Sequence, residues 1–360
     1  MIIQRQRILV INPGSTSTKI AVFDNTKQIF LKNIKHSSKE IGNFKKITDQ
    51  YDFRKNIILE ELKNANISIN SIKIVVARGG LIKPIKSGIY IVNQQMIEDL
   101  KKGVLGQHAS NLGGLIADNI AKSLPRAKAY IADPVVVDEL EDIARISGHP
   151  LFQRISIFHA LNQKAIAREY SKSISKKYED INLIVAHIGG GISIGAHRKG
   201  RVIDVNQALN GEGPFSPERS GTLPMADIVD LCFSNKYTKA EIKKMITGKG
   251  GYVAYLGTND AFKIEKKAEA GDEKAKLIQD AMAYQVAKAI GAKATVLKGE
   301  VDAILLTGGV TYGKPFVDAI KERVSFIAPV FVYPGEDEMK ALAMNGLMVL
   351  NKEIKILKYE

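Results

Sequence analysis

The segment from Leu9 to Phe23, LVINPGSTSTKIAVF, decides how the first part of the chain folds. It predicts two buried strands joined by a short polar turn. The turn and its edges carry an amide, a glycine, two hydroxyl groups and a cation, at Asn12, Gly14, Ser15, Ser17 and Lys19. Glycine allows close approach of the backbone, and N–H, hydroxyl and ammonium groups bind phosphate oxygens. We therefore interpret the turn as a phosphate-binding turn; an ordinary polar hairpin turn is the alternative.

Residues 184–205, IVAHIGGGISIGAHRKGRVIDV, repeat the pattern of residues 9–30: strand, glycine-containing turn, strand, polar turn, strand. In this second copy three consecutive glycines follow His187, and bare backbone of this kind suits a polyphosphate. A third glycine turn, at 308–309, ends an apolar run, where nucleotides bind in α/β folds. Two matching units indicate two related domains that face each other across a cleft; chance recurrence of the pattern is the alternative.

The composition is that of a globular protein, with 360 residues of which 45% are hydrophobic and 25% are charged. The net charge is +14, but the basic residues are scattered among acids and no nucleic-acid-binding motif occurs, so we expect no nucleic-acid partner. No apolar run is long enough for a membrane span or a secretory signal. The single cysteine, Cys232, which we expect to be buried, fits a reducing compartment, and we expect a cytoplasmic protein.

Strand-like and helix-like segments alternate along the chain, which predicts the α/β class. Strands are expected at residues 7–11, 19–23, 72–77, 129–133, 182–188, 192–197, 201–205, 301–309 and 329–334. Helices are expected at residues 53–64, 110–123, 159–172, 274–298 and 338–351.

The stretch VINPGSTSTK, residues 10–19, resembles the N-terminal signature of the acetokinase family, which phosphorylates short carboxylic acids and belongs to the superfamily of sugar kinases, Hsp70 and actin. The match continues in order along nearly the whole chain, through ARGG (77–80), ADP (132–134), FHA (158–160), HIGGG (187–191), PERSG (217–221), LLTGGV (305–310) and PGEDEM (334–339). The chain departs from the acetate kinases of the family where it has Arg78 and Gln163 in place of histidines and Gly190 in place of an asparagine. These variants favour the butyrate-phosphorylating members.

The resemblance implies two RNase H-like (actin-like ATPase) domains, each a mixed β-sheet flanked by helices, with an active-site cleft between them. We expect the first domain to comprise residues 1–165 and a C-terminal helix at about 340–360, and the second, nucleotide-binding domain to comprise residues 166–339. The resemblance also implies a homodimer or a higher homo-oligomer.

The activity that the resemblance implies is reversible phosphoryl transfer between ATP and butyrate, giving ADP and butyryl phosphate, with Mg²⁺ as cofactor. Branched short-chain acids are expected as further substrates. An acetate or propionate kinase is the alternative enzyme. A nucleotide-switched binding protein, such as Hsp70 or actin, is the alternative from another class.

Four residues are expected to be catalytic. A carboxylate acceptor is already anionic at neutral pH, since carboxyl groups titrate near ~4, so the site needs cations, donors and a metal and no general base. Arg78 and Arg219 would hold the carboxylate or the phosphoryl group through paired hydrogen bonds. By resemblance, His159 donates to the migrating phosphoryl group, and Asp133 positions the metal or the arginines. The family arginine nearest to Arg78 aligns with Val75, so Arg78 either replaces it or acts otherwise.

The remaining site residues are expected to bind ATP or ADP and the metal. Nucleotide and phosphate binding is assigned to Asn12, Gly14, Ser15, Ser17, Lys19, His187, Gly189, Gly190, Gly191, Gly308 and Gly309. Mg²⁺ keeps several waters and uses few protein ligands. The resemblance places it near Asn12 and an acidic residue, either Asp337 or Glu338, between which the spacing does not choose. The other histidines, among them His197, are expected to be structural or on the surface.

Overall fold

The computed structural model describes residues 6–360, which cluster into two compact units. The first unit ends at Val137 and takes in Asp337–Glu360, and the second unit is Asp138–Glu336. The domain ranges expected from the sequence place residues 138–165 with the first domain instead, and they stay a prediction. The C-terminal helix, α13 (Glu338–Leu350), lies in the first unit.

The first unit is built on a mixed sheet with the strand order β12-β5-β6-β4-β1-β2-β3. Its strands are β1 (Arg7–Pro13), β2 (Ser17–Asp24), β3 (Lys27–Lys35), β4 (Ile72–Arg78), β5 (Ile89–Ile91), β6 (Lys128–Ala132) and β12 (Ile356–Leu357). Strands β1, β4 and β6 are parallel, whereas β1, β2 and β3 form an antiparallel meander. The helices are α1 (Ser38–Ile41), α2 (Tyr51–Asn64), α3 (Gln94–Lys102), α4 (Asn111–Lys122) and α13 (Glu338–Leu350), with 3₁₀ turns at Ile47–Gln50 and Ile69–Ser71.

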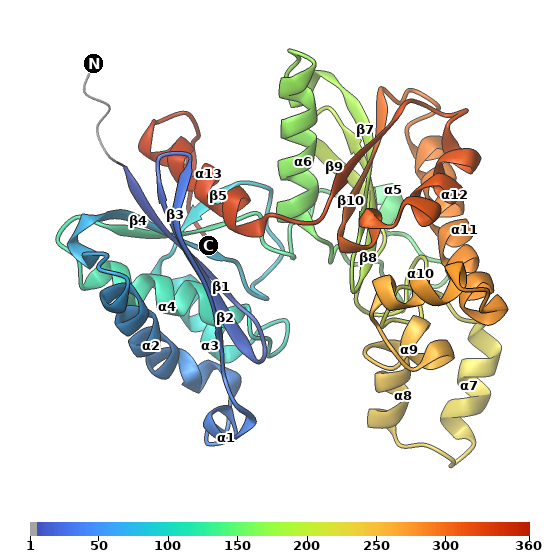
Figure 1. The fold of residues 1–360 in the computed structure, drawn as a ribbon, viewed down its shortest axis with the longest axis horizontal. Helices are drawn as coiled ribbons and strands as arrows, with labels where there is room; N and C mark the ends of the chain where they lie inside the picture. The colour runs from blue at the N-terminus through green and yellow to red at the C-terminus, as the bar shows by residue number, and fades with distance from the viewer. Residues whose placement is uncertain (1–5) are drawn as a thin grey trace. The chain divides into compact units, whose positions relative to one another are not determined.

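Helices cover both faces of this sheet (Figure 1). Gly113 in α4 lies against Ala77, and Gly346 in α13 lies against Val76. Because neighbouring residues of a strand point to opposite faces, α4 and α13 pack on opposite sides of β4. Strands covered on both faces are apolar throughout, which explains the unbroken apolar runs of β1 and β4.

The second unit is built on a smaller mixed sheet with the order β11-β10-β7-β8-β9. Its strands are β7 (Asn182–Ile188), β8 (Ile192–Arg198), β9 (Arg201–Val205), β10 (Ala303–Gly308) and β11 (Val330–Pro334). Its helices are α5 (Asp142–Arg145), α6 (Ala160–Ser173), α7 (Met225–Phe233), α8 (Lys239–Ile246), α9 (Gly251–Leu256), α10 (Ala261–Glu269), α11 (Glu273–Val296) and α12 (Lys314–Val324), with 3₁₀ turns at Tyr178–Asp180 and Gly309–Tyr312.

The core of the second unit lies on both faces of the sheet. Ile184 and Ala186 of β7 pack in one cluster with apolar residues of α11 and α12. Leu183 and Val185, on the opposite face, pack with Ala167 and other residues of α6 and the segment after it. His187 has the same parity as Leu183 and Val185, so its side chain points to the α6 face.

The structure confirms the strands and the five helices expected from the sequence, and the repeat corresponds to the two meanders β1-β2-β3 and β7-β8-β9. The short edge strands β5 and β12 were not predicted. The prediction that Cys232 is buried was wrong: it is exposed, because no residue of α7 is buried. Within residues 6–360, no helix combines the length and the apolar character that a membrane span requires.

Candidate active site

Three of the expected site residues stand side by side at one edge of the first unit's sheet. Ile11 of β1 pairs with Ala77 of β4, and Arg78 pairs with the last residue of β6. Asn12, Arg78 and Asp133 therefore lie at or just beyond the carboxyl ends of three adjacent parallel strands. Ligands of α/β folds bind outside this edge of the sheet.

Glu338, the first residue of α13, joins this edge. The Asn12 Nδ2 group donates a hydrogen bond to Glu338 Oε2, and Arg78 Nη1 lies 3.3 Å from the same oxygen. Asp337 is exposed, and its Oδ1 accepts a hydrogen bond of 2.9 Å from the N–H of Lys340, which caps α13. The structure therefore brings Glu338, and not Asp337, to Asn12.

Asp133 has a strained backbone and an anchored carboxylate. Its φ is +36°, a conformation that is rare for residues other than glycine and costs about 1–3 kcal/mol. Its Oδ1 accepts hydrogen bonds from Ser87 Oγ at 2.6 Å and from the N–H of Gly88 at 2.8 Å, and the residue is buried. Strain that the surroundings maintain in this way is typical of functional positions.

The predicted phosphate-binding turn joins β1 to β2. The Gly14 N–H donates to the Ser17 carbonyl at 2.8 Å, which closes the turn. Ser15 and Lys19 are exposed, and Ser17 is half-buried. Lys19 pairs with Asn12 in the sheet register, so the two side chains point to the same face as α13 and Glu338. In the first unit, sheet pairing or side-chain contacts link Asn12, Lys19, Arg78 and Glu338, whereas Asp337 caps α13.

In the second unit, His159 and His187 stack face to face. Their ring centroids are 3.8 Å apart, with an angle of 14° between the planes. His159 precedes α6, and His187 is near the end of β7. His187 Nδ1 is hydrogen-bonded to Asn162 Oδ1 at 2.8 Å, and its Nε2 lies 3.4 Å from a carboxylate oxygen of Glu336. Because Asn162 Oδ1 can only accept, the proton of this bond belongs to His187 Nδ1.

The hydrogen bonds around Ser193 determine which nitrogen of His159 carries its proton. The Ser193 carbonyl and Oγ accept from Gln163 Nε2 at 2.9 and 2.8 Å. Ser193 Oγ also accepts from the backbone N–H of His159 at 3.3 Å. With both lone pairs engaged, the hydroxyl donates its only proton to His159 Nδ1, 2.8 Å away. Neutral His159 is thereby held with its proton on Nε2.

The same chain of hydrogen bonds continues into the core. Gln163 Oε1 accepts from His197 Nε2 at 2.9 Å, and His197 Nδ1 accepts from the Tyr178 hydroxyl at 2.6 Å. His197 is fully buried, and burial, together with the positive charges of Lys164 and Arg168, holds its pKa well below the usual value. This arrangement requires a neutral His197, which donates from Nε2 and accepts at Nδ1. The hydrogen bond from His197 fixes the orientation of Gln163, and Gln163 in turn orients Ser193 and His159.

Arg219 lies beside the glycine triplet. A Cβ atom built on Gly191 would be 1.9 Å from Arg219 Nη1, so only glycine allows this approach. Arg219 Nη1 donates to the Ala208 carbonyl at 2.5 Å, and within residues 6–360 its buried Nε has no acceptor. Burial lowers the pKa of Arg219, which the neighbouring Glu218 opposes. Arg219 as a whole is half-buried, and a planar guanidinium of this kind is suited to binding an anion.

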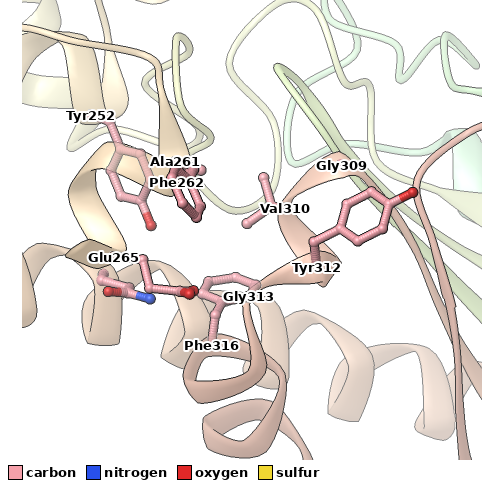
Figure 2. Close-up of a pocket in the computed structure, with 10 residues that line it drawn as sticks. Tyr252, Ala261, Phe262, Glu265, Gly309, Val310, Tyr312, Gly313 and Phe316 are labelled. Atoms are coloured by element: carbon pink, nitrogen blue, oxygen red, sulfur yellow. The ribbon is translucent and has the colours of Figure 1, made fainter. Parts of the chain in front are cut away.

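The third glycine turn borders a pocket, shown in Figure 2. Gly308 has a φ of +100° and exchanges two backbone hydrogen bonds with Gly335, at 2.9 and 3.0 Å. The lining combines apolar and aromatic side chains with one carboxylate, from Tyr252, Ala261, Phe262, Glu265, Gln279, Gly309, Val310, Tyr312, Gly313 and Phe316. Burial, with the nearby Glu269, raises the pKa of Glu265. Flat apolar walls with few polar groups fit a purine base.

Comparison with solved structures defines the fold. The fold matches acetate kinase from Porphyromonas gingivalis with a TM-score of 0.77, at 20% identity over 96% of this chain and 100% of that chain. It matches a propionate kinase from Francisella tularensis with a TM-score of 0.75, at 18% identity over 94% and 98% of the two chains. The chain therefore has the two-domain, actin-like ATPase fold that the sequence predicted.

Sequence comparison identifies the family. The acetokinase family model matches residues 152–324. Butyrate kinase 1 of Clostridium acetobutylicum is 60% identical over 98% of this chain and 99% of its own length, and butyrate kinase 2 of that organism is 58% identical over the same shares. The chain belongs to the acetokinase family, as its sequence motifs predicted.

Several residues of these sites were not identified from the sequence. Arg54 contacts an expected site residue but comes from a segment without a recognisable motif, whereas Ser193 and Asn162 lie within or beside motifs in which other residues were singled out. The only signal available was a hydroxyl residue within the glycine-triplet repeat, for Ser193, and an amide on the helix after His159, for Asn162. The pocket of Figure 2 is lined by residues of α9, α10, α11, α12 and the 3₁₀ turn Gly309–Tyr312, and of these residues only Gly309 was identified from the sequence.

Proposed function

We propose that this protein is an ATP-dependent carboxylate kinase that interconverts butyrate and ATP with butyryl phosphate and ADP. The observation that carries the proposal is the full-length similarity to two butyrate kinases, at 58% and 60% identity. The arrangement of Arg219, His159 and the glycine triplet agrees with it, because each supplies a group that phosphoryl transfer to an anion requires.

The acceptor carboxylate attacks the γ-phosphorus of ATP, the bond from that phosphorus to the β–γ bridging oxygen breaks, and ADP leaves. No proton has to be removed from the acceptor, because a carboxylate is ionised at neutral pH. We assign to Arg219 the neutralisation of the anions, and to His159 Nε2–H a hydrogen bond to the migrating phosphoryl group. His187 holds His159 in place by stacking.

We assign the nucleotide to the second unit, with its phosphates at Gly189–Gly191 and its base in the pocket of Figure 2, beside Gly308 and Gly309. In the first unit, the turn with Gly14, Ser15, Ser17 and Lys19 supplies further donors to phosphate. Arg78 contacts Glu338 and orients it, so Arg78 acts on the metal side of the site. Asp133 is anchored by Ser87 and Gly88, and its assignment to positioning the metal or the arginines stays a prediction.

For Mg²⁺, the donor set of the first unit fits: the side chains of Asn12 and Glu338 are in contact, and each has an oxygen that could bind the ion. Within residues 6–360, no group of three or more His, Cys, Asp or Glu side chains is arranged to bind a metal, which agrees with a Mg²⁺ that keeps most of its waters. When bound, the ion would neutralise the charge of the phosphates. The cytoplasmic location, the homo-oligomer and the absence of a nucleic-acid partner stay predictions.

The proposal is tested by trapping the acyl phosphate with hydroxylamine, in reactions with ATP, Mg²⁺ and one of acetate, propionate, butyrate, isobutyrate or valerate. We expect the highest kcat/KM with butyrate and activity with isobutyrate, since one methylene is worth roughly 1–3 kcal/mol in an apolar pocket. A maximum at acetate or propionate contradicts the butyrate assignment alone. ATP turnover without hydroxamate contradicts the kinase assignment and favours a nucleotide switch.

A further inference from the structure

Arg54, in the first turn of α2, is a buried cation without an ionic partner among residues 6–360. Its side chain is fully buried, and every hydrogen bond that it donates goes to an uncharged oxygen. Burial lowers its pKa to about 10, so it remains protonated at neutral pH. Burying an unpaired charge is costly, and such a residue is retained only where the charge or its hydrogen bonds serve a purpose.

The guanidinium holds the backbone of the phosphate-binding turn. Nη1 donates to the Gly14 carbonyl at 2.7 Å and to the Ser17 carbonyl at 2.9 Å, and Nη2 donates to the Ser15 carbonyl at 2.9 Å. The remaining N–H groups are fixed by Gln50, whose Oε1 accepts from Nε at 3.1 Å and from Nη2 at 2.7 Å. A planar fork with five donors suits such a set of acceptors, and an ammonium group could not satisfy all of them.

Anchoring these carbonyls orients the N–H groups of the turn. In a trans peptide the C=O and the following N–H point in opposite directions. Because the carbonyls of Gly14 and Ser15 point to Arg54, the N–H groups of Ser15 and Thr16 point away from it. The Thr16 carbonyl is fixed as well, by the N–H of His36 at 2.9 Å. Within residues 6–360, neither the Ser15 N–H nor the Thr16 N–H donates to a protein acceptor.

We propose that Arg54 is a positioning residue for phosphate: it holds the turn with its carbonyls turned inward, so that the N–H groups of Ser15 and Thr16 are preformed donors to a phosphate oxygen. Its buried positive charge adds to the attraction for the anion. The inference deepens the proposed function, on which it rests for the identity of the phosphate ligand.

The test measures phosphate binding and the amide groups of the turn separately from catalysis. MgATP and inorganic phosphate are titrated into the ¹⁵N-labelled protein, with affinities from calorimetry. We expect the amide protons of Ser15 and Thr16 to move downfield on binding. In Arg54→Lys, which keeps the charge but not the fork, we expect the dissociation constant to rise about tenfold or more and this shift to be lost.

Two further variants separate the contributions. Gln50→Glu keeps the two acceptor contacts and places a negative charge beside Arg54, so we expect weaker binding with the downfield shift retained. Ile58→Ala, a fully buried residue one turn further along α2, is the matched control for destabilisation: a lower Tm with an unchanged dissociation constant. If Arg54→Lys does not fold, the effect of Gln50→Glu on phosphate binding still tests the contribution of the Arg54 charge.

Any of three results would overturn the inference. The amide-proton shifts of Ser15 and Thr16 could stay unchanged when phosphate binds to the native protein. Arg54→Lys and Gln50→Glu could both bind phosphate as tightly as the native protein, or Ile58→Ala could weaken phosphate binding as much as Arg54→Lys does. The hydroxylamine assay decides the proposed function independently. A protein that forms no acyl phosphate, yet shows the Arg54-dependent shift, retains this inference and loses the kinase assignment.

Discussion

Replacing Gly191 with alanine tests the placement of Arg219. A Cβ at Gly191 would lie 1.9 Å from Arg219 Nη1 and 2.5 Å from its Cζ. The guanidinium therefore has to move by about 1.5 Å, the difference between 1.9 Å and an ordinary contact of 3.4 Å. It would lose its hydrogen bond to the Ala208 carbonyl as it moves.

We expect Gly191→Ala to cause a large loss of activity and a moderate loss of stability. A displacement of about 1 Å in a catalytic group can cost roughly 10²-fold, so we expect kcat/KM to fall about 100-fold or more. Gly191 is not among the glycines with positive φ, and alanine at such a position gains about 0.4–1 kcal/mol from the unfolded state. The lost hydrogen bond has a charged donor and costs about 1.5–3 kcal/mol, so this gain offsets only part of the loss, and we expect a net destabilisation of about 0.5–2.5 kcal/mol.

The assay is hydroxamate formation from butyrate, with Tm measured in parallel, for Gly191→Ala, Arg219→Ala and the double variant. If alanine acts only by displacing Arg219, the double variant is no less active than Arg219→Ala, and the two single losses do not multiply. Gly190→Ala is the comparison within the triplet, and we expect a smaller loss because its Cβ meets Glu218 Oε1 at 3.4 Å. Losses that multiply, or a Gly191→Ala enzyme within fivefold of the native one, refute the reasoning.

Three further predictions concern the hydrogen-bond donor, the metal and the pH dependence of stability. Ser193→Ala removes the hydroxyl that holds the proton of His159 on Nε2, so ¹⁵N NMR should show both neutral tautomers, and kcat should fall about 2–10-fold. Glu338→Gln should raise the Mg²⁺ concentration for half-maximal activity at least tenfold, whereas Asp337→Asn should leave both this concentration and Tm nearly unchanged, because asparagine caps a helix as well as aspartate does. The free energy of unfolding should decrease as the pH falls below about 6.5, because His197 binds a proton only when the chain unfolds; the slope from this residue is at most about 1.4 kcal/mol per pH unit.

Each of these has a contrary outcome. A single Nε2–H tautomer in Ser193→Ala would show that the hydroxyl does not set the proton position. Equal Mg²⁺ requirements in Glu338→Gln and Asp337→Asn would contradict the assignment of the metal ligand. For His197, urea unfolding between pH 5 and 7 of the native protein and of His197→Asn should differ in slope; parallel curves would contradict the burial of a neutral histidine.

The elements of the fold could be predicted from sequence because their signals are local. The apolar run Arg7–Pro13 and the alternation in the two meanders depend on residues next to one another in the chain. Strand order could not be predicted in this way. That Asn12, Arg78 and Asp133 lie side by side follows from parallel pairing of strands separated by about 50–65 residues in sequence, which no local pattern encodes.

The candidate site shows the same division. Lys19, the glycines and Arg219 lie in short motifs, and the residue types in these motifs are enough to predict phosphate or anion binding. Motif spacing could not choose between Asp337 and Glu338, since both are acidic residues at the start of a helix; the packing of α13 on β1 and β4 turns Glu338 toward Asn12.

The sequence by itself determined the α/β class, the two glycine-bearing meanders, the family and most of the residues that bear chemistry, because residue type and short spacing suffice for these. Only the tertiary structure decided how those residues are oriented. Arg54 donates a hydrogen bond to Gly14, which is 40 residues away in the sequence, and Ser193 is hydrogen-bonded to His159, which is 34 residues away. Hydrogen-bond directions, tautomers and the room beside Gly191 are properties of packed atoms brought together from distant segments, and they exist only once the chain has folded.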